Sequence, residues 1–164
     1  EDDHKIVIAL EDSPENLTWS EKRELINQPV ETREDAESDF NGEYYCRKLD
    51  SPDFPAAYYC KTYNKGNRDW YLPSSGELWL IYNHLEEIQT ALSIVGGQKF
   101  DVSRNTGFYW SSTEFIDSTM AWHVNLRRNI AKWFKKYCLK VRPVSKFNFS
   151  KDVVYKENKS EEKR

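Results

Sequence analysis

Histidines and cysteines are among the side chains of this sequence that could act as a nucleophile, a general base or a metal ligand. They are His4, His84, His123, Cys46, Cys60 and Cys138. Their positions form no C-x-x-C motif and no Cys/His cluster, so a structural zinc site is not expected. A Cys/His nucleophile would also need a third, orienting group within hydrogen-bond reach, and no motif brings such groups together. The sequence therefore predicts a protein that is not an enzyme and that uses no metal or cofactor.

Charge is distributed unevenly along the 164 residues, whose formal net charge is -3. Residues 1–60 carry 16 acidic and 6 basic side chains, whereas residues 121–164 carry 4 acidic and 13 basic ones. Residues 121–146 contain no acidic side chain. Their basic residues are Arg127, Arg128, Lys132, Lys135, Lys136, Lys140, Arg142 and Lys146. Such a block is either an electrostatic binding face or a set of internal partners for the acidic first third.

A candidate ligand-binding face lies within residues 115–137. In the predicted strand over 120–127, Trp122, Val124 and Leu126 alternate with polar residues, which predicts one buried and one open side. Aromatic rings, amides and guanidinium groups are typical of sugar-binding sites and protein hot spots. The candidate residues are Phe115, His123, Asn125, Arg127, Arg128, Asn129, Trp133, Phe134 and Tyr137. Because consecutive strand residues point to opposite sides, one of Trp133 and Phe134 is expected to be buried.

Local patterns outline the elements that must position these residues. A strand is predicted over 4–10, followed by an irregular acidic segment over 11–43 with one short helix over 20–26. Helices are predicted over 54–65 and 75–94; Ser74 and Glu77 form a capping box for the second, and Gly96 follows its end. Strands are predicted over 120–127 and 132–144, with a reversal at 128–129. Two helices followed by a strand-rich half predict an α+β fold.

Length and hydropathy indicate the number of domains and whether a helix could cross a membrane. A chain of this size favours one domain of roughly 100–150 residues with tails, and no apolar run approaches the ~18–20 residues of a membrane-spanning helix. The last part of the chain, about ten residues, is expected to be disordered. Nucleic acid is not an expected partner, because the sequence pI is ≈ 5.7 and no nucleic-acid-binding motif is present.

Six motifs, taken in order, resemble those of one known family. They are DFNG at 39–42, PAAYYC at 55–60, WYLPSSGEL at 70–78, YWSSTE at 109–114, AW at 121–122 and KVRPV at 140–144. Their order and spacing are similar to the C-terminal domain family of the Legionella collagen-like adhesin, which has relatives among secreted and surface proteins of Bacteroides-type bacteria. The resemblance covers residues 39–147. It implies a C-type-lectin-like fold, with two helices packed on small antiparallel sheets and long loops.

The resemblance divides the chain into three parts and suggests a disulfide. Residues 1–38 are expected to be a strand and an irregular acidic segment packed on the domain, 39–147 the lectin-like domain, and 148–164 a charged, largely disordered tail. In such folds a cysteine of the first helix is often bonded to the last strand, so Cys60 and Cys138 are the implied pair. A free, buried Cys60 is the alternative. The motif residues themselves are expected to serve the architecture, with Arg142 bridging buried carboxylate or carbonyl groups.

The resemblance also indicates a function class. It implies a secreted or cell-surface-anchored bacterial domain that binds a carbohydrate or a surface protein, without catalysis. Because the chain begins at Glu1 without a methionine, a removed or lipidated N-terminal segment is the expected membrane link. One alternative is a structural domain that docks a partner subunit in a surface assembly. A more distant one is a formylglycine-generating-type oxidase, which is disfavoured because the second half contains only Cys138 where that chemistry needs two cysteines. Calcium-dependent lectin motifs are also missing.

Overall fold

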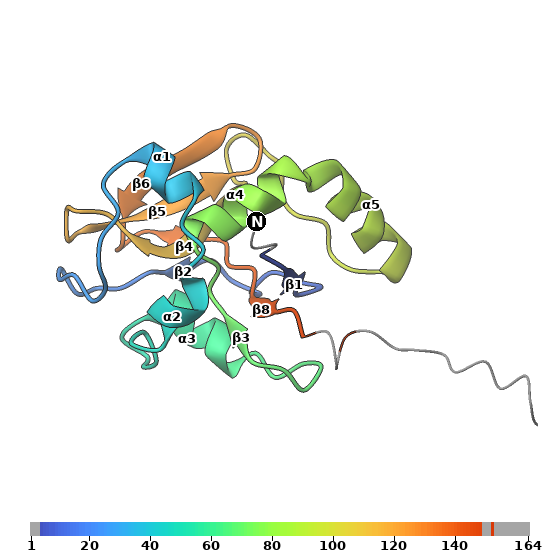
Figure 1. The fold of residues 1–164 in the computed structure, drawn as a ribbon, viewed down its shortest axis with the longest axis horizontal. Coiled ribbons are helices and arrows are strands. Elements are labelled where there is room, and N and C mark those ends of the chain that lie inside the picture. Colours follow the sequence, from blue (N-terminus) through green and yellow to red (C-terminus); the bar gives the residue numbers. More distant parts are fainter. Residues whose placement is uncertain (1–3, 149–151, 153–164) are drawn as a thin grey trace, which may run out of the picture.

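The computed structural model describes residues 4–148 and 152, and its α+β architecture confirms the predicted fold class (Figure 1). The described strands form small antiparallel sheets. One sheet has the order β1 (Ile6–Ile8), β8 (Val144–Lys146) and β3 (Trp70–Tyr71), and another pairs β2 (Leu17–Thr18) with β7 (Cys138–Leu139). The sheet that carries the candidate face has the order β4 (Phe108–Glu114), β5 (Met120–Asn125) and β6 (Asn129–Phe134).

The described helices are short. They are α1 (Arg33–Glu37), α2 (Gly42–Cys46), α3 (Pro55–Thr62), α4 (Ser75–Asn83) and α5 (Leu85–Val95). Those over 33–37 and 42–46 were not predicted, and two of the predicted helices differ in the structure. The predicted helix over 20–26 is absent, because the Ser20 and Ile26 amides donate to the Lys135 carbonyl and the Glu114 carboxylate instead. The single helix predicted over 75–94 is divided at His84, which has φ -120° and ψ 21°.

The capping box at the start of α4 is present as predicted. The Ser74 side chain accepts a hydrogen bond from the Glu77 amide, and the Glu77 carboxylate accepts one from the Ser74 amide. At the other end, α5 stops at Gly96, whose φ of 73° is a left-handed conformation that glycine adopts without a Cβ clash. These local signals therefore predicted both boundaries of the α4–α5 unit.

The β4–β5–β6 sheet is covered on both faces, which the alternating pattern of β5 did not predict. On one face, Trp122 and Val124 belong to a core cluster with Leu78 and Ile81 of α4. On the other face, Ala121 belongs to a second cluster, whose other members include Trp19, Phe54, Trp110 and Val141. A strand in the middle of a two-sided core buries its polar residues together with its apolar ones.

The family motifs meet in buried polar networks. Arg142 donates from Nε to Asp12 Oδ1 at 2.7 Å, from Nη1 to the Ala9 carbonyl at 3.0 Å and from Nη2 to the Gln98 carbonyl at 2.8 Å. This confirms the predicted bridging role of Arg142. It also joins the segment after β1 to the C-terminal part of the domain.

A second network joins three of the motifs. The Asp39 carboxylate accepts hydrogen bonds from the Tyr45 and Thr113 hydroxyls. The backbone carbonyl of Asp39 accepts one from Ser74 Oγ at 2.6 Å. Glu77 accepts from Tyr71 at 2.6 Å, and burial beside this carboxylate raises the pKa of the tyrosine. The buried carboxylates of Asp39 and Glu77 are thus matched with donors, as a polar core requires.

Candidate functional site

His123 and Asn125, which the sequence placed on an open face, are buried in the structure. Their exposed fractions are 5% and 1%. His123 lies between the rings of Phe108, at 5.5 Å, and Trp110, at 6.3 Å. Burial lowers the pKa of His123 to about 4, and its Nδ1 has no hydrogen-bond partner in the described structure. Neither residue is available to a ligand, and the prediction for both was wrong.

Asn125 instead shapes the turn between β5 and β6. Its Oδ1 accepts from the Arg127 amide at 3.0 Å, and its Nδ2 donates to the Arg104 carbonyl at 3.3 Å. Arg127 and Arg128 lie exposed on this turn, and Asn129, opposite Asn125 in the register, is half-buried. The turn thus presents two guanidinium groups at the end of the sheet opposite to Phe134.

Trp133, Phe134 and Tyr137 form the most exposed part of the candidate face. Their exposed fractions are 45%, 37% and 44%, and each ring contacts the other two, with centroids 5.4–6.1 Å apart. We call these three residues the aromatic cluster. Both Trp133 and Phe134 are exposed, contrary to the prediction that one of them is buried. They lie at the end of the edge strand β6, and neither of them belongs to a core cluster.

Phe115 is half-buried, and its ring is not one of those that contact one another in the aromatic cluster. Its ring packs edge-on against Trp122 at 5.6 Å, and Lys132 Nζ lies 4.1 Å from its centroid. Phe115 therefore contributes to the core and to a cation–π contact.

Lys135 is turned inward at the tight bend between β6 and β7. Only 1% of it is exposed, and its Nζ donates to Glu114 Oε1 at 2.8 Å and to the Glu24 carbonyl at 3.0 Å. The Glu114 carboxylate also accepts from the Ile26 and Asn27 amides. This buried pair and its hydrogen bonds hold residues 19–30 against the sheet. The inward position of Lys135 leaves Phe134 and Lys136, on either side of it, exposed.

The basic block is divided between the two roles that the sequence left open. Lys135 and Arg142 pair internally with Glu114 and Asp12, and Lys140 lies 3.7 Å from Asp101. In the part of the chain that the structure describes, the other exposed members of the block form no ion pair. They are Arg127, Arg128, Lys132, Lys136 and Lys146.

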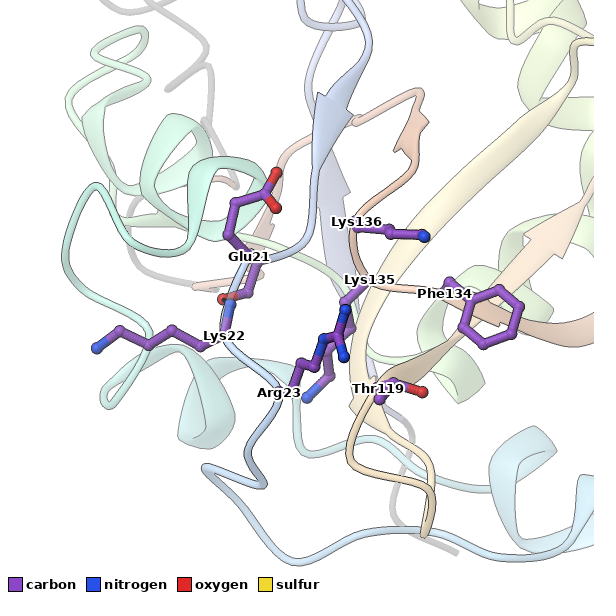
Figure 2. A pocket seen from close by; sticks show the side chains of 8 residues that line it. Glu21, Lys22, Arg23, Thr119, Phe134, Lys135 and Lys136 are labelled. Carbon is purple, nitrogen blue, oxygen red and sulfur yellow. Dashed lines mark hydrogen bonds between the residues drawn. The ribbon is translucent and has the colours of Figure 1, made fainter.

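A small pocket adjoins the aromatic cluster and draws on distant parts of the sequence (Figure 2). Its volume is ≈ 240 Å³. It is lined by Ser20, Glu21, Lys22, Arg23, Thr119, Phe134, Lys135 and Lys136. Figure 2 shows Arg23, Thr119, Phe134 and Lys136 around the pocket, while Lys22 extends away from Phe134. Lys22 pairs with Asp53 at 3.1 Å, whereas no ion pair of Arg23 is found among residues 4–148.

Arg23 and Thr119 are among the members of this pocket that the sequence did not predict as site residues. Arg23 lies within the acidic first third, and Thr119 lies in the loop before β5. The Trp19 and Ser20 amides donate to the Lys135 carbonyl, and the Lys135 amide donates to the Thr119 carbonyl, which brings the three segments together. No local signal could have identified them, because these contacts span up to about a hundred positions of sequence.

The cysteines do not form the implied disulfide. Cys46, Cys60 and Cys138 are all free. Cys60 is buried in the second core cluster, whereas Cys138 is exposed on β7, so the alternative of a free, buried Cys60 holds. Burial raises the pKa of Cys46 to about 12 and also raises that of Cys60.

The described residues contain no group of three or more His, Cys, Asp or Glu side chains placed to hold a metal ion. None of the helices described is both long enough and apolar enough to cross a membrane.

Comparison with known proteins identifies the family of this chain. A family model described as the Lcl C-terminal domain matches residues 9–145. The matched range includes residues 9–38, which contain none of the six motifs and which hold Arg23 and the Glu114-bound segment. No curated protein and no solved structure matches the chain.

Proposed function

The chain belongs to the family of the Lcl C-terminal domain, and from this premise we propose that it is a non-enzymatic ligand-binding or adhesion domain. Its proposed ligand is a carbohydrate or a protein on a cell surface. The observation that carries this proposal is the aromatic cluster, in which three large rings lie exposed and in mutual contact beside unpaired cations. Exposed rings of this kind are more typical of interaction sites than of a solvated surface.

We propose a C-type-lectin-like fold for the domain, as the motifs suggest. This is supported by the antiparallel pairing of β1 with β8, which holds the N-terminal and C-terminal strands together, and by the small sheets joined by long connections. The proposed setting is outside the cytoplasm, secreted or attached to the surface of a bacterium, on the strength of the motif resemblance. A removed or lipidated N-terminal segment would supply the attachment.

A structural domain that docks a partner subunit in a surface assembly is the second candidate. The combination of Trp, Tyr and Arg near the cluster favours it, because these residue types dominate protein hot spots. In that case the same face would be permanently covered in the assembled protein.

The direct test is an array of glycans and bacterial or host surface proteins, probed with the purified domain at low salt. Binding is expected to be lost in Trp133→Ala. Tyr44→Ala is the matched control, because Tyr44 is 55% exposed on α2 and makes no contact with the cluster. Absence of any ligand at low salt, or equal binding by Trp133→Ala and the wild type, would contradict the proposal.

A further inference from the structure

We propose that the surface formed by the pocket and the aromatic cluster recognises an acidic segment of another protein. A carboxylate of that segment lies in the pocket, and an adjacent apolar side chain packs on the aromatic cluster. This inference rests on the proposed function and narrows its ligand class. It concerns the pocket of Figure 2 and the three rings beside it.

The polar groups of the pocket that remain for a ligand are mainly cations. Ser20 Oγ already accepts from the Lys22 amide, and Thr119 Oγ1 donates to Asp117 at 2.7 Å. Arg23 and Lys136 remain, and neither forms an ion pair within the described residues. Glu21 also lines the pocket, and Figure 2 shows its side chain on the opposite side of the view from Phe134. The Arg23 and Lys136 side chains are both positively charged and can donate hydrogen bonds but not accept them. They therefore favour an anionic group that accepts hydrogen bonds.

Pocket size favours a single side-chain group. The volume of ≈ 240 Å³ lies below the range of roughly 300–1,000 Å³ that is usual for small-molecule sites. One carboxylate with its methylene group fits such a space. An oligosaccharide would have to lie mostly outside it.

The geometry of the aromatic cluster favours a protein side chain over a sugar ring. The planes of Trp133 and Phe134 differ by 56°, those of Phe134 and Tyr137 by 67°, and those of Trp133 and Tyr137 by 32°. These tilted rings form no common plane on which a pyranose could lie. They form an uneven apolar surface, into which an aliphatic or aromatic side chain packs edge-on.

Phe134 connects the two halves of the proposed site. It lines the pocket and also belongs to the aromatic cluster. A segment with an acidic residue close to an apolar one can therefore contact both halves at once. Lys22 is already paired with Asp53, so Arg23 and Lys136 are the cations that supply the charge complementarity.

The test uses an array of synthetic dodecapeptides in which Asp or Glu and Leu or Phe occupy every relative spacing from one to four. A second array replaces each acid with its amide. Binding is expected for acidic peptides only. Arg23→Gln and Lys136→Gln are each expected to weaken it about tenfold, as for loss of one charged hydrogen bond. Lys99→Gln, which removes an exposed lysine on the loop after α5, is the control.

The outcomes separate this inference from the proposed function. Equal binding of acidic and amide peptides, or full binding by both Gln variants, overturns the inference. If no peptide binds while a sulfated or neutral glycan binds in a Trp133-dependent way, the proposed function stands and the protein partner is wrong. If neither peptides nor the glycan and surface-protein array give binding, both fail. Thermal unfolding of each variant establishes that it is folded, and because the substituted residues are exposed, little loss of stability is expected.

Discussion

At the scale of single residues, His123 illustrates how burial changes the role of a polar side chain. It occupies a polar position in an alternating strand, yet it packs between Phe108 and Trp110 with Nδ1 unpaired. A buried imidazole is held neutral because desolvation disfavours the charged form. Its pKa of about 4 is below the ordinary value of 6.5.

This difference predicts a stability that depends on pH. The unfolded chain binds a proton at His123 below pH 6.5, and the folded chain does so only near pH 4. Stability is therefore fully present above pH 6.5, falls as the pH decreases toward 4, and changes no further through this group below that. The total effect is on the order of 3 kcal/mol.

Urea unfolding of the wild type and His123→Leu at several pH values measures this effect. The difference in unfolding free energy between the two proteins is expected to shift in favour of the variant between pH 6.5 and 4. Other carboxylates titrate in both proteins and cancel in the difference. Parallel curves for the two proteins would show that His123 is not the group responsible.

The thiols give a second prediction at this scale. Cys138 is exposed, Cys46 is half-buried and Cys60 is buried, and all three are free. A chromogenic disulfide reagent is expected to react rapidly with one thiol per folded chain and with three in denaturant. Cys138→Ser should remove the rapid reaction. A denatured, unreduced protein with only one reactive thiol would instead indicate a disulfide.

At the scale of elements, the decisive contact is the one between residues 19–30 and the β4–β5–β6 sheet. The Glu114–Lys135 pair and the backbone bonds around it replace the helix that was predicted over 20–26. That prediction relied on a local capping residue, Ser20, and on nearby acids. A short helix is only marginally stable alone, so the long-range bonds to the sheet decide its conformation.

Removing one partner of this buried pair should be costly. Glu114→Leu leaves the Lys135 ammonium buried with only the Glu24 carbonyl, and a loss of about 3–5 kcal/mol is expected. Lys135→Met should cost less, because the Glu114 carboxylate keeps the Ile26 and Asn27 amides as donors. The double variant should be more stable than the sum of the single losses predicts. Chemical unfolding measures the four proteins, and strict additivity would mean that the two side chains do not interact.

Elements whose signals are local were predicted well. The capping box of α4, the end of α5 at Gly96 and the strand β5 all follow from neighbouring residues. The break at His84 was missed, because the apolar repeat of 78–92 continues across it. The polar side of β5 was wrongly predicted to be open, since alternation indicates which residues share a side but not what covers that side.

At the scale of the whole molecule, the basic block of the sequence has two separate effects. Arg142 and Lys135 are buried with carboxylates and stabilise the fold, whereas Lys136 is exposed beside the aromatic cluster, together with Arg23 from the first third of the chain. Salt screens exposed charges over a Debye length of about 10 Å at 0.1 M and affects buried pairs much less. Binding and folding should therefore respond differently to ionic strength.

Raising NaCl from about 20 mM to about 300 mM should weaken ligand binding several-fold, because the site's cations are exposed. The free energy of unfolding should change little over the same range. Titration calorimetry or fluorescence anisotropy measures the first, and urea unfolding the second. Salt-independent binding would mean that the aromatic cluster alone, and not the exposed cations, accounts for the affinity. A large loss of stability with salt would mean that exposed pairs contribute substantially to the fold.

The sequence by itself determined the α+β class, the family, the start of α4 and the presence of a basic, aromatic block, because each of these depends on neighbouring residues or on ordered motifs. Only the tertiary structure decided which members of that block reach solvent. His123 and Asn125 are buried because a second layer covers β5, whereas Trp133 and Phe134, at the end of the edge strand β6, belong to neither core cluster and are exposed. Arg23 lies at the site because the Trp19 and Ser20 amides, just before it in the sequence, donate to the distant Lys135 carbonyl. Burial and long-range pairing depend on what packs against a residue, and that information is not local.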